Sequence, residues 1–518
     1  MKQGLSEILV SESVYDSVSR IPYKGYVVIK DGMITETGKG AVPARLRDSG
    51  IPMSDYGHGT ICAGLGDTHT FFAGYVMDSL GVDLSEVKTL KELKGIIEDE
   101  LSTKEGGSVL FGNHLSGALI SDPETSGLLD ELGEYKEVSI ILFATGHGTC
   151  AMNKIAQRRF EFDPDHCYSE AMHKIMPCYL TDRDFIIPQF KKYMKLLNSR
   201  GVTSVKEMGF DDYYGFTDVL KEMEDSGELT VRICFMSQPV GRSMDLEYGK
   251  RMREKFTSDF VKFSGFNQMT DGLILKKQGH LLEPYEGTDT ICEKQIDYEG
   301  IEKDVLEADR QGFRFTLHSE GDGAFRRILD IYDKCQKEDG KLLNRHGITD
   351  LELTDPEDEQ RMARLGVFGE IYAQVYLLDT WKGYVDGYRA VIGDRQKRYL
   401  NYRSLTDHGV CLCGATDLPL LIPSLPEAVF YGCANYGSDR GKRINPDNGI
   451  TVEEMVYAWT YGSQYAMEQE SILGTLETGK QADIVIFDGD LFHTPMEKIL
   501  DVKVVRTLVK GKEVYQDL

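Results

Sequence analysis

Short apolar segments with the composition of strands alternate with helical stretches through the middle of this 518-residue chain. The strand candidates are residues 139–144, 202–206, 230–236, 313–318, 347–353, 367–372 and 409–413. Amphipathic helices, such as residues 183–199 and 323–337, lie between some of them. This alternation is typical of parallel strands joined by crossover helices, so the middle of the chain is predicted to be an α/β sheet or barrel.

Both ends of the chain carry short β segments. The turn Asp31-Gly32 separates two β-rich runs near the start, and Lys510-Gly511-Lys512 follows another near the end. Asp-Gly between such runs predicts a hairpin. We therefore expect residues 1–63 and 470–518 to join in a small composite β-sandwich. Residues 64–469 would form a separate domain, with an insertion at about 78–200.

Charge and cysteine content narrow the class of protein. The net charge of −25 argues against nonspecific binding of nucleic acid or of an anionic membrane, since both need a positive surface. No apolar run approaches the length of a membrane span, and the ten cysteines include no CxxC pair. We expect a cytoplasmic homodimer that acts on a small molecule and binds neither nucleic acid nor membrane.

Several short motifs follow one another in an order that resembles the amidohydrolase superfamily, in particular its family 3 type. They are Asp67-Thr68-His69, Gly201-Val202-Thr203, Asp271-Gly272 with Glu283-Pro284-Tyr285, His318-Ser319-Glu320-Gly321-Asp322, Ala415-Thr416-Asp417-Leu418-Pro419 and a closing segment from Gly474 to Asp483. The resemblance implies a (β/α)8 TIM barrel whose active site lies at the carboxyl ends of its strands.

The resemblance also implies metal ligands. His69, His318 and Asp417 match ligand positions of the family, and Asp350 stands where another histidine is usual, as a substitute ligand or as an ordinary loop aspartate. Asp417 would in addition accept a proton from the bound water.

Two departures change the expected metal site. Phe71 replaces a histidine of the family, and Asn267 or Gln268 occupies the place of a lysine that is carboxylated to bridge two metals. Neither amide side chain can supply that bridging anion. We therefore expect one divalent ion, Zn, Mn or Fe, with an open position for water.

Other residues are candidates for contacts with the substrate. His147 matches a family histidine near the substrate, and His280 lies in a loop where its alternative is simply to face solvent. Either histidine would bind the substrate or donate a proton. Lys276 and Lys277 would hold an anionic or oxyanionic group, although adjacent lysines are mostly solvated. Phe71 would form part of an apolar wall for a ring-bearing substrate.

These features predict a metal-dependent hydrolase in which an activated water attacks the carbonyl of a small substrate, in particular a cyclic one, at an amide or ring C–N bond. One alternative is a C–C bond hydrolase that opens a cyclic 1,3-diketone such as dihydrophloroglucinol, because an enolate can leave in the same way. The other alternative is an inactive binding or regulatory barrel, which takes the loss of a histidine at Phe71 at face value.

Overall fold

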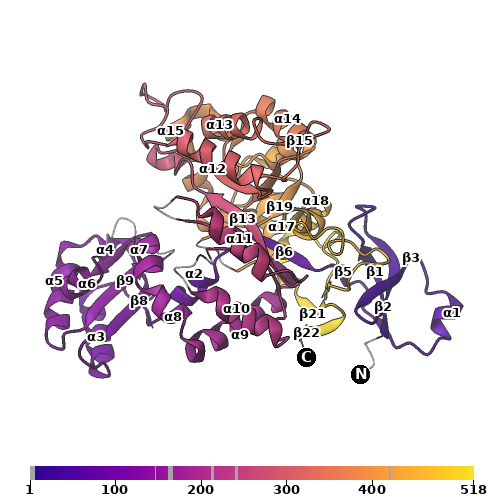
Figure 1. The fold of residues 1–518 in the computed structure, drawn as a ribbon, viewed down its shortest axis with the longest axis horizontal. Helices are drawn as coiled ribbons and strands as arrows, with labels where there is room; N and C mark the ends of the chain where they lie inside the picture. The colour runs from indigo at the N-terminus through magenta and orange to yellow at the C-terminus, as the bar shows by residue number, and fades with distance from the viewer. Residues whose placement is uncertain are drawn as a thin grey trace.

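The computed structural model describes residues 6–145, 148–161, 167–209, 211, 215–239, 243–418, 420 and 422–517. Strands from the middle of the chain form a central sheet, strands from the two ends form a second sheet, and the insertion forms a third (Figure 1). No helix within these ranges is both long enough and apolar enough to cross a membrane.

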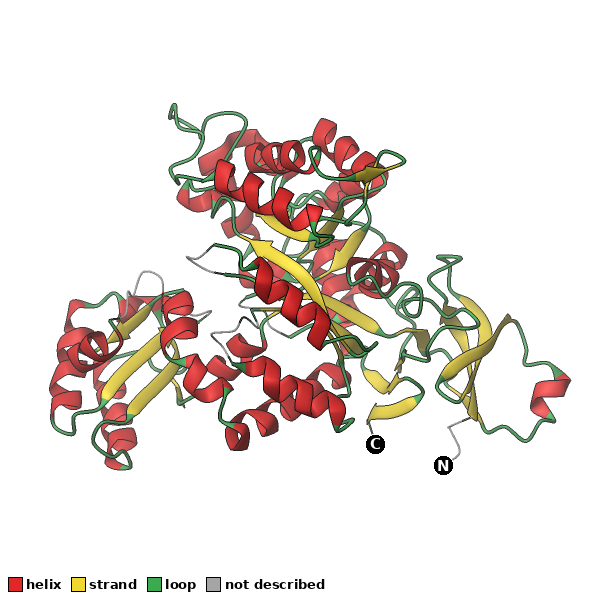
Figure 2. Cartoon of the chain, viewed as in Figure 1, coloured by secondary structure: helices red, strands yellow, loops and turns green. Residues whose placement is uncertain are grey.

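Eight parallel strands form the central sheet (Figure 2). In chain order they are β6 (Leu65–Thr70), β11 (Val202–Met208), β12 (Arg232–Ser237), β13 (Val261–Gln268), β14 (Phe315–Ser319), β17 (Gly347–Asp350), β18 (Phe368–Ile371) and β19 (Leu412–Gly414). Their spatial order is the same, and every neighbouring pair is parallel. This arrangement is a nearly closed (β/α)8 barrel, and it confirms the predicted fold class.

Side chains and loops close the barrel between its first and last strands. The Thr68 hydroxyl of β6 donates a hydrogen bond of 3.1 Å to the carbonyl of Gly414 in β19. Just beyond these strands, the Asp417 amide donates to the carbonyl of His69 at 2.9 Å. The buried Asp67 carboxylate accepts from the Thr416 amide at 3.2 Å and from the Thr416 hydroxyl at 2.6 Å. The strand that carries His69 and the loop that carries Asp417 are therefore held side by side.

Helices cover the outside of the barrel, and capping residues define where several begin. They include α9 (Arg183–Ser199), α10 (Phe216–Asp225), α11 (Leu246–Lys255), α12 (Tyr298–Arg310), α13 (Asp322–Tyr332), α14 (Pro356–Leu365) and α17 (Leu425–Ala434). Asp182 caps α9 by accepting from the amides of Asp184 and Phe185, and Asp355 caps α14 in the same way. The helix predicted at 183–199 is confirmed.

The helix predicted at 323–337 ends earlier than expected. Helix α13 stops at Tyr332, and Lys337–Glu338 forms the short strand β15, which pairs with β16 (Lys341–Leu342). The Asp309 carboxylate accepts from the Gln336 amide at 2.8 Å, so a long-range contact takes the backbone donor that a longer helix would have used.

Strands from both ends of the chain join in one hydrogen-bonded sheet. The first group is β1 (Ser6–Tyr15), β2 (Tyr23–Lys30), β3 (Met33–Lys39), β4 (Met53–Asp55) and β5 (Thr60–Ala63), and the second is β20 (Ile484–Phe487), β21 (Val504–Val509) and β22 (Lys512–Gln516). The turns at Asp31-Gly32 and Lys510-Gly511 connect antiparallel pairs, which confirms both hairpins. Arg506 also forms a two-pronged ion pair with Glu7, at 2.8 and 2.9 Å.

The insertion folds around a hydrophobic core of its own. Its sheet contains β7 (Val82–Asp83), β8 (Val109–Leu115), β9 (Ser139–Ala144) and β10 (Cys150–Met152), and it packs with α3 (Leu90–Ser102) and α5 (Pro123–Glu134). That core includes Leu93, Leu129 and Ile140, all fully buried. The strand predicted at residues 139–144 is present as β9, but it belongs to the sheet of the insertion and not to the barrel, because an apolar run shows that a strand is buried without showing which sheet it joins.

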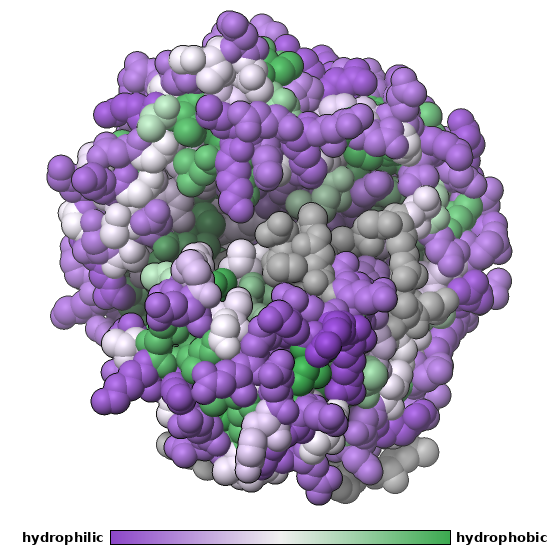
Figure 3. Space-filling view, turned by 90° about the vertical axis from the view of Figure 1, so that its left-hand side faces the viewer, coloured by the Kyte–Doolittle hydropathy of each residue, from purple (hydrophilic) through white to green (hydrophobic). Residues whose placement is uncertain are grey.

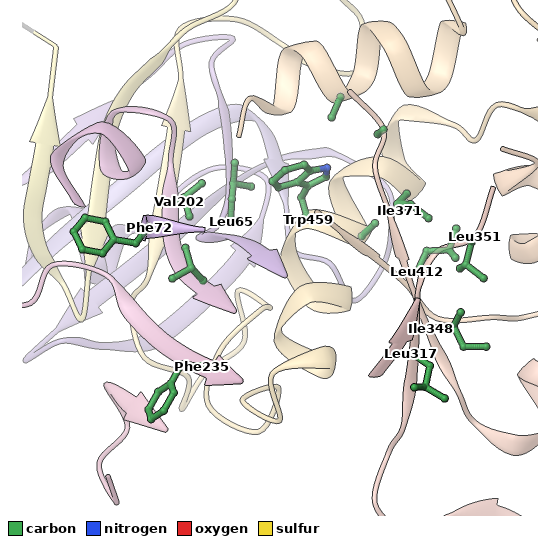
Figure 4. Packing of buried hydrophobic residues seen from close by; sticks show 14 of the residues in the cluster. Leu65, Phe72, Val202, Phe235, Leu317, Ile348, Leu351, Ile371, Leu412 and Trp459 are labelled. Carbon is green, nitrogen blue, oxygen red and sulfur yellow. The ribbon is translucent and has the colours of Figure 1, made fainter. Parts of the chain in front are cut away.

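The barrel core continues from β6 to β19. Leu65, Val202, Leu317, Ile348 and Leu412 lie on five of its strands and belong to one buried cluster, which also includes the fully buried Trp459 (Figure 4). A β-carbon at Gly414 would lie 2.5 Å from the Trp459 indole, so only glycine fits at this point of β19. This packing fixes the positions of the strand ends that carry the candidate site.

Candidate functional site

A cavity of about 720 Å³ lies at the carboxyl ends of the barrel strands. The arrowhead of β13 points toward the side of the molecule on which the insertion lies (Figure 1). Seen from that side, the surface is hollowed, with hydrophobic residues in the depth of the hollow (Figure 3). The residues that line the cavity include His69, Phe71, Asn267, His318, Asp350 and Asp417. Four predicted metal ligands and one predicted substrate contact are therefore brought to a single wall.

His69 is held from behind by a carboxylate and a hydroxyl. Its Nδ1 lies 2.9 Å from a Glu370 carboxylate oxygen and 3.1 Å from the Tyr372 hydroxyl. Its Nε2 faces Asp417, with 3.8 Å between that nitrogen and Oδ1. A carboxylate on Nδ1 fixes the ring and its tautomer, and leaves Nε2 as the atom that can bind a metal.

His318 is likewise flanked by carboxylates, although its buried Nδ1 has no hydrogen-bond partner among the described residues. Its Nδ1 lies 3.3 Å from Asp271, whose carboxylate is oriented by the backbone amides of Glu320, Gly321 and His280. Its Nε2 lies 3.6 Å from Asp350 and 3.7 Å from Glu320. Each imidazole thus has one carboxylate near its Nδ1 and at least one near its Nε2.

The carboxylates of the site favour a cation in front of the imidazoles. Burial lowers the pKa of His318, but Asp350, Asp271 and Glu320 outweigh that effect and hold the pKa well above its usual value. Burial raises the pKa of Asp417 to about 6, with Asp350 adding to the rise and His69 opposing it. In the absence of a metal, a proton on His318 supplies part of the positive charge that this wall requires.

Both candidate carboxylate ligands sit on strained backbone. Asp350 has φ of +71° and Asp417 has φ of +64°, in the left-handed region that residues other than glycine rarely adopt. Such conformations cost on the order of 1 kcal/mol or more and concentrate at functional sites. The Asp417 amide bonds to the His69 carbonyl at 2.9 Å and the Thr349 hydroxyl bonds to Asp350 at 2.7 Å, so local contacts hold both residues in place.

The donor set fits a divalent ion. An ion with bonds of about 2.1 Å separates two neighbouring ligand atoms by roughly 3.0–3.5 Å, close to the 3.8 Å of His69 and Asp417 and the 3.6 Å of His318 and Asp350. Two imidazoles and two carboxylates are ordinary ligands of Zn, Mn or Fe. The four residues form two separate pairs, and among the described residues no three of them have ligand atoms within 4.8 Å of one another. A shared ion would therefore have to draw the two pairs together.

A second group, Asp309, Cys335 and His346, does have ligand atoms within 4.8 Å of one another. Its histidine is already satisfied on both nitrogens. Nδ1 accepts from the Phe315 amide at 3.0 Å, and Nε2 lies 3.1 Å from Asp309. Because Nδ1 accepts, Nε2 must carry the proton, and no lone pair of this ring is left for a metal. This buried group has a structural role.

Sequence reasoning missed two charged residues inside the barrel. Lys206 of β11 and Glu370 of β18 are fully buried and form an ion pair, and Glu370 also holds His69. Burial raises the pKa of Glu370, but Lys206 and His69 outweigh that effect, so its pKa lies below the usual value. The signal was the presence of charged residues within two otherwise strand-like segments, since charged groups are rarely buried unless paired.

Glu207, the residue next to Lys206, is also buried. Its carboxylate accepts from the Thr70 hydroxyl at 2.7 Å and from the Phe72 amide. Burial raises the pKa of this carboxyl to about 8. These contacts anchor the chain where β6 passes into α2 (Phe72–Asp78). These contacts give Glu207 a structural role beside the site.

Three other candidate residues lie away from the cavity wall. Lys276 and Lys277, at the end of the short 3-10 helix Ile274–Lys276, are not among the residues that line it. His280 is also outside the lining, and its Nδ1 lies 2.7 Å from the Tyr298 hydroxyl. The backbone of His280 packs against Gly321 and Gly323, and this packing fixes the loop. The predicted roles of these three residues receive no support from their positions, and His147 lies outside the described residues.

Comparisons with solved structures support the same architecture. The chain is similar to a crystal structure described as an uncharacterized metal-dependent hydrolase from Pyrococcus horikoshii OT3, with a TM-score of 0.73, 18% identity and coverage of 95% of this chain and 99% of that chain. A second metal-dependent hydrolase, from Pyrococcus furiosus, gives a TM-score of 0.71 at 20% identity, over 93% and 98% of the two chains. At these identities the likeness shows the fold.

Sequence comparisons place the chain in a family. It is 21% identical to Protein LONG AFTER FAR-RED 3 of Arabidopsis thaliana, over 99% of this chain and 92% of that protein. It is 22% identical to the putative amidohydrolase YtcJ of Bacillus subtilis, over 51% and 49%, and 25% identical to an N-substituted formamide deformylase of Arthrobacter pascens, over 41% and 38%. Residues 57–515 match the sequence profile of the Amidohydrolase family (Amidohydro_3), so this chain belongs to that family.

Proposed function

We propose that this chain is a hydrolase that depends on one divalent ion, Zn, Mn or Fe, and cleaves an amide or ring C–N bond of a small, cyclic substrate. The observation that carries the proposal is the matched setting of the two imidazoles. His69 and His318 each have a carboxylate at Nδ1 and present Nε2 beside a second carboxylate, on the wall of one cavity. That is how histidine ligands are oriented toward a metal.

The side chains of the wall divide into distinct roles. His69, His318, Asp350 and Asp417 would hold the ion, and Asp417 would also accept the proton of the attacking water. When bound, the ion would lower the pKa of a water molecule and polarise the substrate carbonyl. Phe71 lines the cavity 5.4 Å from the His69 ring, between ring centroids, and would exclude water from one side of the site.

One ion suits this chain better than two. Asn267, at the end of β13, lines the cavity where the family resemblance places a bridging lysine. Its Oδ1 accepts from the Thr316 hydroxyl, whereas its buried Nδ2 has no partner among the described residues. An amide group cannot supply a bridging anion, but this free N–H is available to a substrate oxygen.

The test is a hydrolysis screen with metal analysis. Purified protein with added Zn or Mn is assayed on cyclic amides, N-acyl compounds and cyclic diketones, beside H69A and H318A variants. The control is H493A, because the His493 side chain is 74% exposed and lies outside the cavity. We expect about one bound ion and C–N bond hydrolysis in wild type and control, and at least roughly a hundredfold loss of activity in the other two variants.

Three outcomes would overturn the proposal or its chemistry. Ring opening of the diketones alone would assign C–C bond hydrolysis. Sub-stoichiometric metal that is insensitive to H69A and H318A, without hydrolysis of any compound, would favour an inactive binding barrel. Activity that survives in H69A and H318A would show that neither imidazole holds the ion.

A further inference from the structure

The wall of the cavity is acidic. Glu320, Asp350, Glu352, Asp379 and Asp417 all line it, and among the described residues neither Lys nor Arg does. Two of these carboxylates belong to the proposed ion site, which leaves three others facing the space where a substrate would bind. Such a wall repels an anionic substrate and favours one that carries a positive charge.

Glu352 is surrounded by tyrosines on this wall. The Tyr399 hydroxyl donates to one of its carboxylate oxygens at 3.1 Å, and the Tyr388 hydroxyl donates to the other at 3.3 Å. The Tyr384 ring lies 6.0 Å from Tyr399 and 6.4 Å from Tyr388, between ring centroids. All three rings line the cavity. One carboxylate is thus framed by three aromatic rings.

Glu352 forms no ion pair with a lysine, arginine or histidine of the described chain; the tyrosine hydroxyls are its hydrogen-bond donors. A carboxylate beside aromatic rings is a setting in which an ammonium group gains both ionic and cation–π attraction. Burial and the nearby Glu320 and Asp350 hold the pKa of Glu352 well above its usual value, and an ammonium group bound there would oppose that shift.

Apolar side chains surround the opening of the cavity. Met269, Leu273 and Leu275 are each 46% exposed, and Leu378 is 48% exposed. All four line the cavity. Hydrophobic residues that stay this exposed around an acidic hollow suit a ligand with an apolar body and a charged end.

We propose that Glu352, with Tyr384, Tyr388 and Tyr399, binds an ammonium group of the substrate, so that the substrate is a small amine-bearing compound with an apolar body. This inference rests on the proposed function, because it takes the cavity as the substrate site. It reverses the substrate charge that the predicted roles of Lys276 and Lys277 implied.

The test measures binding without catalysis. Cyclohexylammonium and the neutral cyclohexanol, which have nearly the same shape, are titrated calorimetrically into the full-length protein stripped of metal. We expect the wild-type protein to bind the ammonium at least roughly tenfold more tightly than the alcohol. Equal binding of the two probes, or no binding of either, would overturn the proposal with no variant needed.

A pair of variants locates the ammonium. E352Q should reduce the preference for the ammonium to about twofold or less, and D350N should reduce it less than E352Q does, because Asp350 is on the side of the proposed ion site. Loss of the preference in D350N with retention in E352Q would show that the probe occupies the ion site, and would contradict the proposal. Circular dichroism and the melting temperature confirm that both variants fold.

The same experiment separates this proposal from the proposed function. If the chain binds the ammonium through Glu352 but hydrolyses nothing, the proposed function fails and the ammonium site stands. If it hydrolyses amides, E352Q should raise KM for amine-bearing amides at least roughly tenfold and leave KM for their uncharged analogues unchanged. Equal effects on both substrate sets would assign Glu352 a structural role.

Discussion

Each candidate histidine depends on a buried carboxylate behind it. Glu370 lies 2.9 Å from Nδ1 of His69, and Asp271 lies 3.3 Å from Nδ1 of His318. At His69 the hydrogen bond to Glu370 sets which nitrogen carries the proton and where the other nitrogen points, and at His318 the nearby Asp271 carboxylate favours a proton on Nδ1. Metal binding by His69 and His318 would therefore depend on two carboxylates that do not themselves contact the metal.

The role of Glu370 can be tested by substitution. We predict that E370Q lowers zinc affinity by about 10- to 100-fold, because the carboxylate that fixes the His69 ring and raises its basicity is lost. Competition with a chelator of known affinity measures the change. Y372F is the matched control, since it removes only the hydroxyl 3.1 Å from the same nitrogen and should change affinity by about threefold or less. Equal zinc affinities of the wild-type protein and E370Q would show that Glu370 does not support His69 as a metal ligand.

Individual residues differed in how far the sequence could predict them. His69, His318, Asp350 and Asp417 lie at or just after strand ends, and a barrel gathers such positions at one mouth, as the structure has it. Glu352 and Glu370 act through contacts with residues far away in the chain, and no local spacing reveals such contacts. Lys276 and Lys277 were predicted to contact the substrate but do not line the cavity, because the path of a loop cannot be predicted from its composition.

At the scale of elements, the strands rich in β-branched and apolar residues were the predictable ones. The segments 202–206 and 367–372 correspond to β11 and β18. Strand β13 was not among the candidates, because Gly265 and the polar residues Ser264 and Asn267 interrupt its apolar pattern. Its pairing with β12 and β14 is what makes it a strand. Tertiary contacts override local propensity in this way.

The packing of Gly414 in strand β19 against Trp459 predicts an effect on stability. G414A should destabilise the protein by about 1–3 kcal/mol, because the added methyl group would meet the buried Trp459 indole at 2.5 Å. Urea unfolding measures the change. The control is G95A in α3, where an added β-carbon meets nothing within 4 Å and a helix interior should gain roughly 1 kcal/mol. Unchanged stability of G414A would show that the packing of β19 on Trp459 is loose.

At the scale of the whole molecule, the sheet formed by β1–β5 and β20–β22 joins the two ends of the chain. Glu7 of β1 and Arg506 of β21 form an ion pair that is mostly buried, and the Arg506 guanidinium also donates a hydrogen bond of 2.8 Å to the Tyr56 hydroxyl. Burial raises the pKa of Glu7, yet Arg506 and Ser54 outweigh that effect and hold its pKa below the usual value. This pair links stability to pH.

The pH dependence has a definite direction. A carboxyl whose pKa is lower in the folded state stabilises the fold at pH values above its unfolded pKa of about 4.3, and this stabilisation is lost as pH falls through the folded pKa. We predict that E7Q lowers the free energy of unfolding by about 2 kcal/mol at pH 7, and that the difference shrinks below about pH 4.5. E513Q, which removes a more exposed partner of Arg506, should cost roughly 1 kcal/mol or less. A pH-independent difference would show that charge is not the cause.

The position of the bound metal would show whether His69 and His318 hold one shared ion. Anomalous diffraction at the zinc absorption edge, on crystals of the zinc-loaded protein, locates the metal without reference to activity. We predict one peak at the cavity wall within about 2.3 Å of Nε2 of His69, Nε2 of His318 and a carboxylate oxygen of Asp417. A peak at Asp309, Cys335 and His346 with none at the cavity, or two peaks at the cavity, would contradict this account.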